Sequence, residues 1–284
     1  LAAIAGRMGI KLDMESFDSL SRTIPVIVDL KPSGEGYMED LYKAGGLPRI
    51  LLALKDRLHL DVSTITGKTL GQIIEGTQFL WQQNIVKSAA EPIYHEGGMA
   101  VLKGNLAPNS AIIKQSAASD SLLTHSGRAV VFDGLEDLAN RIDSEELDVK
   151  KDDILVLRYI GPKGAPGMPE AGLIPIPKKL AREGVKDMVR ISDGRMSGTA
   201  SGTIILHVCP EAAVGGPLAL VQTGDRISLD VKSRSLHLHV EDSELASRLE
   251  TLDLSRFIAK RGYHKLYMEH VLQADEGVDF DFLV

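Results

Sequence analysis

The chain has 284 residues, 44% of them hydrophobic and 25% charged, and carries a formal net charge of −7. That length suffices for about two domains with a sizeable buried core. Basic and acidic residues are scattered along the whole sequence, so no concentrated basic face is offered to nucleic acid or to anionic lipid. The apolar runs are far shorter than the roughly 20 residues that cross a bilayer, and no signal-peptide pattern opens the chain. These features predict a cytoplasmic protein with neither nucleic acid nor membrane as a partner.

Residues 1–88 are predicted to be mostly helical. Their apolar residues recur at helical spacing, most clearly over residues 47–58. One short strand is predicted at residues 25–30, where it leads into a glycine-bearing loop. This αβα arrangement lacks the neighbours that would complete it, and the sequence does not begin with methionine. We therefore expect a remnant of an α/β domain that is truncated at its start.

Residues 89–242 are typical of a β-rich domain, because short apolar or alternating segments are separated by glycine and proline. The clearest alternation, over residues 227–231 and 236–240, describes two adjacent strands with one buried face. With a small helix at residues 135–142, the pattern predicts a closed or nearly closed β-barrel flanked by helices. The other predicted strands occupy residues 99–106, 111–114, 129–133, 154–160, 189–193 and 203–208.

From residue 243 the helical spacing returns, which predicts a C-terminal helical tail over residues 243–284. The sequence stops on the apolar run VDFDFLV, so part of this tail is also expected to be missing. Cys209 is the only cysteine, which excludes an internal disulfide and is compatible with a reducing compartment. One cysteine also cannot hold an iron–sulfur cluster alone.

The segment GPKGAPGMPE, residues 161–170, follows a predicted strand and has three glycines and three prolines in ten residues. Such a loop is stiff and irregular, and it ends in the carboxylate of Glu170. One interpretation is a connector whose glutamate is simply solvated. The other is a Mg²⁺ ligand, because hard cations require oxygen donors held in a fixed position.

The segment SDGRMSGTASGT, residues 192–203, lies between two predicted strands and is rich in hydroxyl groups and glycine. It can be a flexible turn with capping serines, or a loop whose N–H groups converge on an anion and hold a serine against a substrate. No histidine lies within it and the nucleophile-elbow pattern is absent, which argues against acyl transfer.

Three histidines, His207, His237 and His239, lie in predicted strands. The last two have the alternate-residue spacing that places side chains on one face, where a pair of imidazoles could bind zinc. A polar outward face opposite Leu236 and Leu238 is favoured, because no third ligand is nearby in the sequence.

Several long strings of the sequence occur in the same order in a known enzyme family. They are DLKPSG, AGGLPRILLAL, LKGNLAPNSAIIK, GPKGAPGMPE, SDGRMSG and HVCPEAAVGGPLALVQTGD. Through them nearly the whole chain resembles the dehydratases that include dihydroxy-acid dehydratase, phosphogluconate dehydratase and the pentonate dehydratases. The resemblance implies a homodimer or homotetramer that depends on Mg²⁺ and on an iron–sulfur cluster of the 2Fe–2S or 4Fe–4S type. It removes water from a 2,3-dihydroxy acid to give a 2-keto-3-deoxy acid.

The resemblance also implies a domain organisation. The family has an N-terminal α/β domain that binds the cluster, followed by a β-barrel like the swivelling domain of aconitase. Residues 1–88 would then be the C-terminal part of the cluster-binding domain, residues 89–242 the barrel domain, and residues 243–284 the helical tail.

Two site residues are carried over from the family motifs. Ser197, in the string DGRMSG, takes the place of the family's base, and Glu170, which closes GPKGAPGMPE, takes the place of a Mg²⁺ ligand. Arg195, Gly198 and Thr199 of the same loop are predicted to contact the substrate. The family's cluster cysteines, its other Mg²⁺ ligands and its modified lysine would lie upstream, so the resemblance implies no iron–sulfur ligand in this chain.

The substrate is predicted from the residues that follow Ser197. Thr199 and Ala200 resemble the branch that acts on aldonates, and extra hydroxyl groups suit a polyol chain better than an alkyl chain. We therefore predict a dehydratase acting on a pentonate or a similar sugar acid. Two alternatives stay open: a dihydroxy-acid dehydratase of branched-chain amino-acid synthesis, and a non-catalytic barrel domain that binds a small acid.

We predict that the 284-residue chain alone binds no cluster and does not dehydrate sugar acids, because a single cysteine cannot supply the three or more ligands that a cluster usually needs. The purified chain should be colourless, with iron and sulfide near zero by chemical analysis. A brown preparation that dehydrates an aldonate would contradict this prediction.

Overall fold

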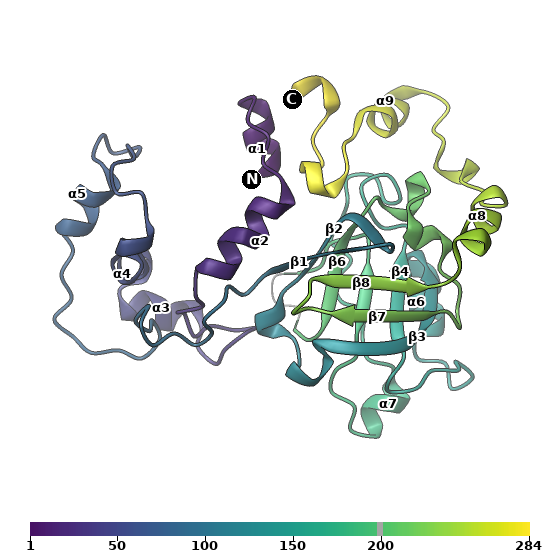
Figure 1. The fold of residues 1–284 in the computed structure, drawn as a ribbon, viewed down its shortest axis with the longest axis horizontal. Coiled ribbons are helices and arrows are strands. Elements are labelled where there is room, and N and C mark those ends of the chain that lie inside the picture. Colours follow the sequence, from purple (N-terminus) through teal and green to yellow (C-terminus); the bar gives the residue numbers. More distant parts are fainter. Residues whose placement is uncertain (198–200) are drawn as a thin grey trace. The chain divides into compact units, whose positions relative to one another are not determined.

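The computed structural model describes residues 1–197 and 201–284 (Figure 1). The chain forms two compact units. The larger consists of Leu1–Asp18 and Met99–Val284, and the smaller of Ser19–Gly98.

The larger unit is built around a closed eight-stranded barrel (Figure 1). Its strands run around the barrel in the order β1, β2, β6, β5, β4, β3, β7, β8. Each predicted strand of the β-rich region is present, so the predicted barrel is confirmed. The strands are β1 (Ala100–Gly104), β2 (Ala107–Ile113), β3 (Thr124–Asp133), β4 (Ile154–Arg158), β5 (Arg190–Ser192), β6 (Ile204–Cys209), β7 (Arg226–Asp230) and β8 (Ser235–His239).

Four neighbouring strands of the barrel are parallel. β3 pairs with β4, β4 with β5, and β5 with β6, all in parallel register. β2 and β7 then pair antiparallel with the outer strands of this group. Parallel strands present their carboxyl ends at one edge, so the loops that follow β3, β4, β5 and β6 leave the barrel together.

The parallel strands are buried on both faces. Ile154 and Val156 of β4 belong to the apolar cluster inside the barrel, whereas Leu155 and Leu157 belong to a second cluster outside it. Burial on both sides explains why β4 reads as a continuous apolar run, whereas β7 and β8, with one buried face, alternate. Phe132, fully buried, anchors the outer cluster.

Helices flank the barrel in the larger unit, and the predicted helix at residues 135–142 is confirmed as α6. The helices of this unit are α1 (Ala2–Arg7), α6 (Gly134–Arg141), α7 (Lys178–Arg182), α8 (Asp242–Glu250) and α9 (Gly262–His270), and α2 (Met14–Thr23) begins in it. Short 3₁₀ turns are η2 (Gln115–Ala117), η3 (Asp120–Leu122), η4 (Ala212–Val214), η5 (Pro217–Leu220), η6 (Ser255–Phe257), η7 (Ala274–Glu276) and η8 (Asp281–Leu283).

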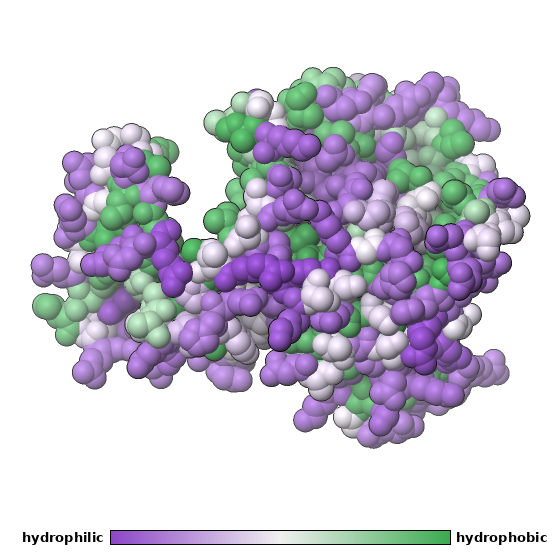
Figure 2. All heavy atoms as spheres, in the orientation of Figure 1, coloured by the Kyte–Doolittle hydropathy of each residue, from purple (hydrophilic) through white to green (hydrophobic). Residues whose placement is uncertain are grey.

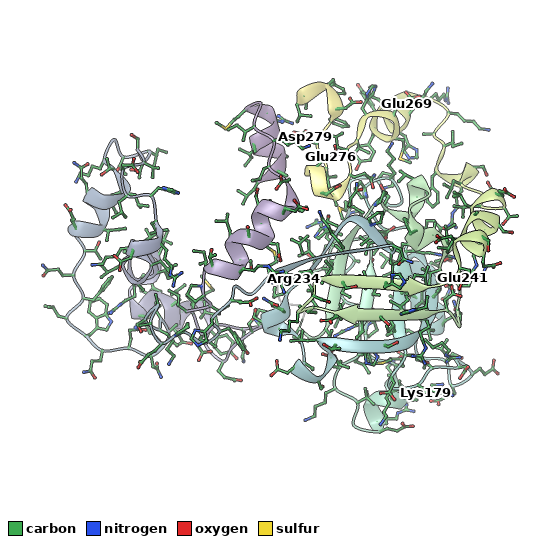
Figure 3. The ribbon with its side chains drawn as sticks, in the orientation of Figure 1. Lys179, Arg234, Glu241, Glu269, Glu276 and Asp279 are labelled. Atoms are coloured by element: carbon green, nitrogen blue, oxygen red, sulfur yellow. The ribbon has the colours of Figure 1, made fainter. Side chains whose placement is uncertain are left out.

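Ion pairs hold the first residues of the chain against the rest of the larger unit. Arg7 donates two hydrogen bonds to Asp279, at 2.5 and 2.7 Å. Arg234 contacts Asp18 at 2.7 Å, and both side chains are largely buried. Figure 3 labels Arg234 and Asp279 at these two contacts. Planar guanidinium groups suit such carboxylate contacts because they present several N–H donors in a fixed geometry.

The smaller unit is helical, with α3 (Met38–Ala44), α4 (Gly46–Ala53), α5 (Leu70–Glu75) and the 3₁₀ turn η1 (Lys55–Arg57). The strand predicted at residues 25–30 is wrong. Val26, Val28 and Leu30 each form an isolated bridge, and the three bridges go to three different segments. Alternating apolar residues produced the strand pattern, but among residues 1–197 and 201–284 no continuous strand pairs with this segment.

Large apolar side chains of the smaller unit remain exposed, including those of Leu47, Ile65 and Leu80. Figure 2 shows hydrophobic residues at the surface among hydrophilic ones. Within residues 1–197 and 201–284, no helix combines the length and the apolar character that a membrane crossing requires.

Candidate active site

The two predicted site loops leave the same edge of the barrel. Residues 161–170 come after the end of β4, and residues 193–203 follow β5, its parallel neighbour. Because the carboxyl ends of parallel strands share an edge, Glu170 and Ser197 lie on adjacent loops of that edge. Ligand sites of parallel sheets are commonly built there.

Asp193, directly after β5, is fully buried and organises this edge. Its carboxylate accepts hydrogen bonds from the backbone N–H groups of Tyr159, Ile160 and Ala212, at 3.1, 3.1 and 3.0 Å. Tyr159 follows β4 and Ala212 follows β6, so one carboxylate joins the ends of three strands. Burial raises the pKa of Asp193 to about 6 against the opposing effect of the three N–H donors, which leaves the group mainly ionised at neutral pH.

Glu211 plays a similar part for the loop at residues 161–170. Its buried carboxylate accepts the N–H groups of Lys163 and Gly164, with the shorter contact at 2.8 Å, and a hydrogen bond from the Gln273 side chain. Burial raises the pKa of Glu211, and these donors oppose the rise. A side chain at Gly164 would place its Cβ 2.5 Å from the carbonyl carbon of Tyr159, so only glycine fits this close approach.

Two hydrogen bonds join the loops that carry Glu170 and Ser197. Arg195 Nε donates to the carbonyl oxygen of Met168 at 2.7 Å, and Ala171 N donates to the carbonyl oxygen of Arg195 at 3.0 Å. Met168 is buried with a left-handed φ of 45°, a conformation that its surroundings must stabilise. Glu170 lies between these two bonds in sequence, two residues from Met168 and one from Ala171.

The side chains of the predicted residues differ in their surroundings. Glu170 is exposed, and within residues 1–197 and 201–284 its carboxylate has no hydrogen bond or ion pair. Ser197 is half-buried and comes directly after the buried Met196. Gly198 and Thr199 lie outside the described residues. The predicted substrate contact of Arg195 stays a prediction, and the structure shows that its Nε is engaged by Met168.

His207 contacts the loop that follows β5, which the sequence pattern did not predict. It lies in β6 with a left-handed φ of 54°, and its backbone N–H donates to the carbonyl oxygen of Gly194 at 3.2 Å. Burial lowers the pKa of His207, and the charge of Arg195 lowers it further, so the imidazole is neutral at pH 7. The bulge that shifts the register between β2 and β6 accounts for this backbone geometry.

His237 and His239 are exposed, whereas the alternating Leu236 and Leu238 are buried, so the predicted outward polar face is confirmed. Their rings contact each other edge to face, 4.8 Å apart. His239 also lies 2.6 Å from the Ser228 hydroxyl.

The part of the chain that the structure describes contains no group of three or more His, Cys, Asp or Glu residues placed to hold a metal ion. Glu170 alone suits a hard cation, as one oxygen donor. Cys209 is buried, and burial raises the pKa of its thiol, which disfavours the thiolate that a cluster ligand requires. The described residues therefore fit a partial Mg²⁺ site and do not fit an iron–sulfur site.

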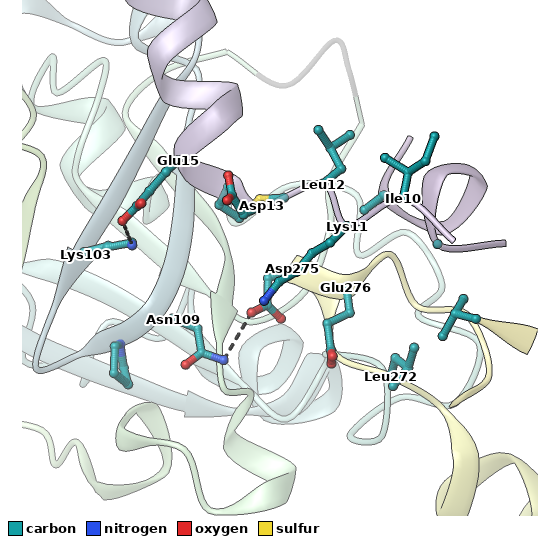
Figure 4. A pocket seen from close by; sticks show the side chains of 15 residues that line it. Ile10, Lys11, Leu12, Asp13, Glu15, Lys103, Asn109, Leu272, Asp275 and Glu276 are labelled. Carbon is teal, nitrogen blue, oxygen red and sulfur yellow. Dashed lines mark hydrogen bonds and ion pairs between the residues drawn. The ribbon is translucent and has the colours of Figure 1, made fainter. Parts of the chain in front are cut away.

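A hollow of about 630 Å³ lies elsewhere in the larger unit, between the first helices and the C-terminal segment (Figure 4). In its lining, Lys103 contacts Glu15 at 2.5 Å and Asn109 donates to one carboxylate oxygen of Asp275 at 3.1 Å, whereas the other oxygen of Asp275 is buried and has no hydrogen bond among the described residues. Neither Glu170 nor Ser197 lines it. This hollow is therefore separate from the candidate active site.

Two family models match the chain. The model described as dihydroxy-acid/6-phosphogluconate dehydratase C-terminal matches residues 84–278, and the corresponding N-terminal model matches residues 1–73. The chain belongs to the dihydroxy-acid/6-phosphogluconate dehydratase family.

Similar curated proteins include dehydratases of different acids. The chain is 48% identical to an L-arabonate dehydratase of Azospirillum brasilense and 46% identical to a 6-deoxy-6-sulfo-D-gluconate dehydratase of Pseudomonas putida, in both cases over 100% of the chain. It is 39% identical, over 98% of its length, to a dihydroxy-acid dehydratase of Thermodesulfovibrio yellowstonii. These matches cover 50%, 49% and 50% of the three proteins, so the chain spans about half the length of the relatives.

Replacing Asp193 by asparagine should destabilise the barrel by about 1–3 kcal/mol, because an amide has one acceptor oxygen and leaves at least one of the three N–H groups without a partner. Urea unfolding followed by far-UV circular dichroism measures the change in the free energy of unfolding. Asp152→Asn is the control, because Asp152 is exposed and its side chain has no hydrogen bond to the described residues. Equal stability of the two variants would show that Asp193 does not hold the strand ends.

Proposed function

We propose that this chain forms the barrel half of the active site of a dehydratase that converts a sugar acid, an aldonate, to a 2-keto-3-deoxy acid. The observation that carries the proposal is the pair of hydrogen bonds between Arg195 and the backbone around Glu170. These bonds hold together the loops of a carboxylate and a serine at the carboxyl ends of parallel strands. Family membership adds support, because the relatives described above are dehydratases of hydroxy acids.

In this proposal Glu170 is one oxygen ligand of Mg²⁺. Its carboxylate is suited to that role because it is exposed and has no partner among the described residues. When bound, Mg²⁺ neutralises the substrate carboxylate and so acidifies the neighbouring C–H bond. The remaining ligands must come from groups outside residues 1–197 and 201–284, because these contain no complete metal site.

Ser197 is the proposed base that accepts the proton from carbon 2 of the substrate. The hydroxyl group on carbon 3 leaves as hydroxide, which together with the proton from carbon 2 makes up the water released, and the resulting enol relaxes to the ketone. A serine is a poor base unless it is ionised, so positive charge and N–H donors near its oxygen are needed. Arg195, two residues earlier, provides a cation on the same loop, and Gly198 and Thr199 are the proposed substrate contacts beside it.

The proposal includes an iron–sulfur cluster bound by the portion of the enzyme that this chain does not cover, next to an aconitase-like barrel in a homodimer or homotetramer. The described residues of this chain do not fit the cluster, because Cys209 is buried and no group of three or more possible ligands is present among them. An aldonate is the preferred substrate because identity is higher to the relatives named for sugar acids, 48% and 46%, than to the dihydroxy-acid dehydratase, 39%. Comparing turnover of a pentonate with that of a branched 2,3-dihydroxy acid separates these substrates. Turnover of neither would favour a non-catalytic acid-binding barrel.

Ser197→Ala, made in a dehydratase that contains this chain together with the cluster-binding half, should lower turnover by about 10²- to 10⁴-fold with much less change in substrate affinity. The reason is that one oxygen that removes the proton is lost while the metal ligands remain. Exchange of the C2 proton with solvent, followed by NMR, reports the step directly. Wild-type exchange in the variant would remove Ser197 from the role of base.

Glu170→Gln in the same enzyme should act differently, because an amide oxygen is a weaker Mg²⁺ ligand than a carboxylate. We expect the Mg²⁺ concentration for half-maximal activity to rise by about tenfold or more, with a parallel rise in KM for the acid. The matched control is Glu183→Gln, since Glu183 is exposed and lies beyond α7. Unchanged Mg²⁺ dependence in Glu170→Gln would contradict the assignment of Glu170 as a metal ligand.

A further inference from the structure

Tyr267, in α9 of the C-terminal segment, reaches the loop that carries Glu170. Its hydroxyl donates to the carbonyl oxygen of Pro162 at 3.0 Å and accepts the backbone N–H of Gly167 at 2.8 Å. These two residues lie five positions apart near opposite ends of the loop, so one oxygen atom closes it. Tyr267 is about a hundred residues distant in sequence, and no motif pointed to it.

A second contact from the same segment supports the loop at its base. Gln273 donates from its side chain to Glu211 at 2.8 Å and accepts the Glu211 backbone N–H at 2.8 Å. Glu211 in turn accepts the N–H groups of Lys163 and Gly164. The start of the loop is therefore fixed by Glu211 and Gln273, whereas Tyr267 reaches further along it, to three residues before Glu170.

Beyond Gly164 the loop is also held by Arg195, whose Nε donates to the carbonyl oxygen of Met168 at 2.7 Å, and by the buried Met168 side chain. A turn joins Met168 N to the carbonyl oxygen of Ala165 at 2.7 Å, and Gly167 has a left-handed φ of 84°. Such a backbone has many accessible conformations when it is not restrained. A ligand on a loop binds a metal more tightly when the loop is already in the bound shape, because less ordering is needed on binding.

We propose that Tyr267 is a positioning residue that sets the affinity of the site for Mg²⁺ by holding the loop at residues 161–170 closed. The inference rests on the proposed role of Glu170 as a Mg²⁺ ligand. Tyr267 touches neither substrate nor metal in this role and acts through the loop backbone. Its hydroxyl remains a donor at neutral pH, because burial raises the pKa of Tyr267.

The test is Tyr267→Phe in a dehydratase that contains this chain and the cluster-binding half. The ring is kept and with it the edge contact to Phe280, whose ring centroid lies 5.8 Å away, so the fold should be retained. We expect the Mg²⁺ concentration for half-maximal activity to rise about 3- to 10-fold, because both hydrogen bonds of the hydroxyl to the loop are lost, with kcat at saturating Mg²⁺ within about twofold of wild type.

Hydrogen exchange measured by mass spectrometry supplies a readout independent of activity. In Tyr267→Phe without Mg²⁺, the peptide that covers residues 161–170 should exchange faster than in wild type, and saturating Mg²⁺ should restore much of the protection. The matched control is Tyr263→Phe, one turn earlier in α9, where the side chain is 91% exposed. This control should match wild type in both measurements.

Two results for Tyr267→Phe would overturn the inference: faster loop exchange with unchanged Mg²⁺ dependence, or no change in either measurement. The proposed function would stay intact in both cases if Glu170→Gln still alters the Mg²⁺ dependence. A fall in kcat that saturating Mg²⁺ does not correct would also overturn the inference. If Glu170→Gln leaves Mg²⁺ dependence unchanged, the metal role of Glu170 fails and the role of Tyr267 fails with it, which distinguishes the two failures.

Discussion

The candidate site depends on the buried carboxylate of Asp193. Burying a charge is costly unless it is well paired, and three backbone N–H groups supply that pairing. Those N–H groups lie where strands β4 and β6 have ended and no neighbouring strand remains to accept them. One side chain therefore satisfies the donors and fixes the starting points of three loops relative to one another, which includes both loops that carry Glu170 and Ser197.

Further hydrogen bonds hold the two loops beyond this carboxylate. Glu211, beyond β6, holds the start of the Glu170 loop, and Arg195 joins that loop to the serine loop through Met168. Each step uses an acceptor or donor from a different part of the chain. Loops positioned by a rigid scaffold are the common place for catalytic groups, because their ends are fixed while their tips can carry reactive side chains. Hydrogen bonds between loops, and not regular secondary structure, hold this part of the protein in place.

The barrel was predictable because its signal is local. Alternation in β7 and β8 and continuous apolar runs in β4 reflect burial on one face or two, and they appear in the sequence itself. The bracing was not predictable, since Asp193 and Tyr159 are 34 residues apart and Tyr267 and Gly167 are 100 apart. Asp193 lies within the string SDGRMSG, but its role as the acceptor of three hydrogen bonds could not be predicted without the strand order. The strand predicted at residues 25–30 was wrong for the same reason, because its pairing depended on partners that the pattern could not reveal.

When the ligands of a metal site come from different parts of an enzyme, a restraint on a ligand loop affects metal affinity and protein stability differently. Mg²⁺ prefers six oxygen ligands at close to octahedral geometry, and the described residues contain no group of three or more side chains that could hold it, so the proposed ligand Glu170 can supply only part of the site. If the other ligands belong to another part of the enzyme, looseness at the end of the Glu170 loop costs little in the stability of the barrel, because Pro169 and Glu170 are exposed and bury little apolar surface. The same looseness lowers the affinity for the metal, because the ligand must adopt a single position when the metal binds. The proposed effect of Tyr267, which contacts the loop beyond its base, is therefore on metal affinity, whereas the fully buried Glu211 also contributes to folding.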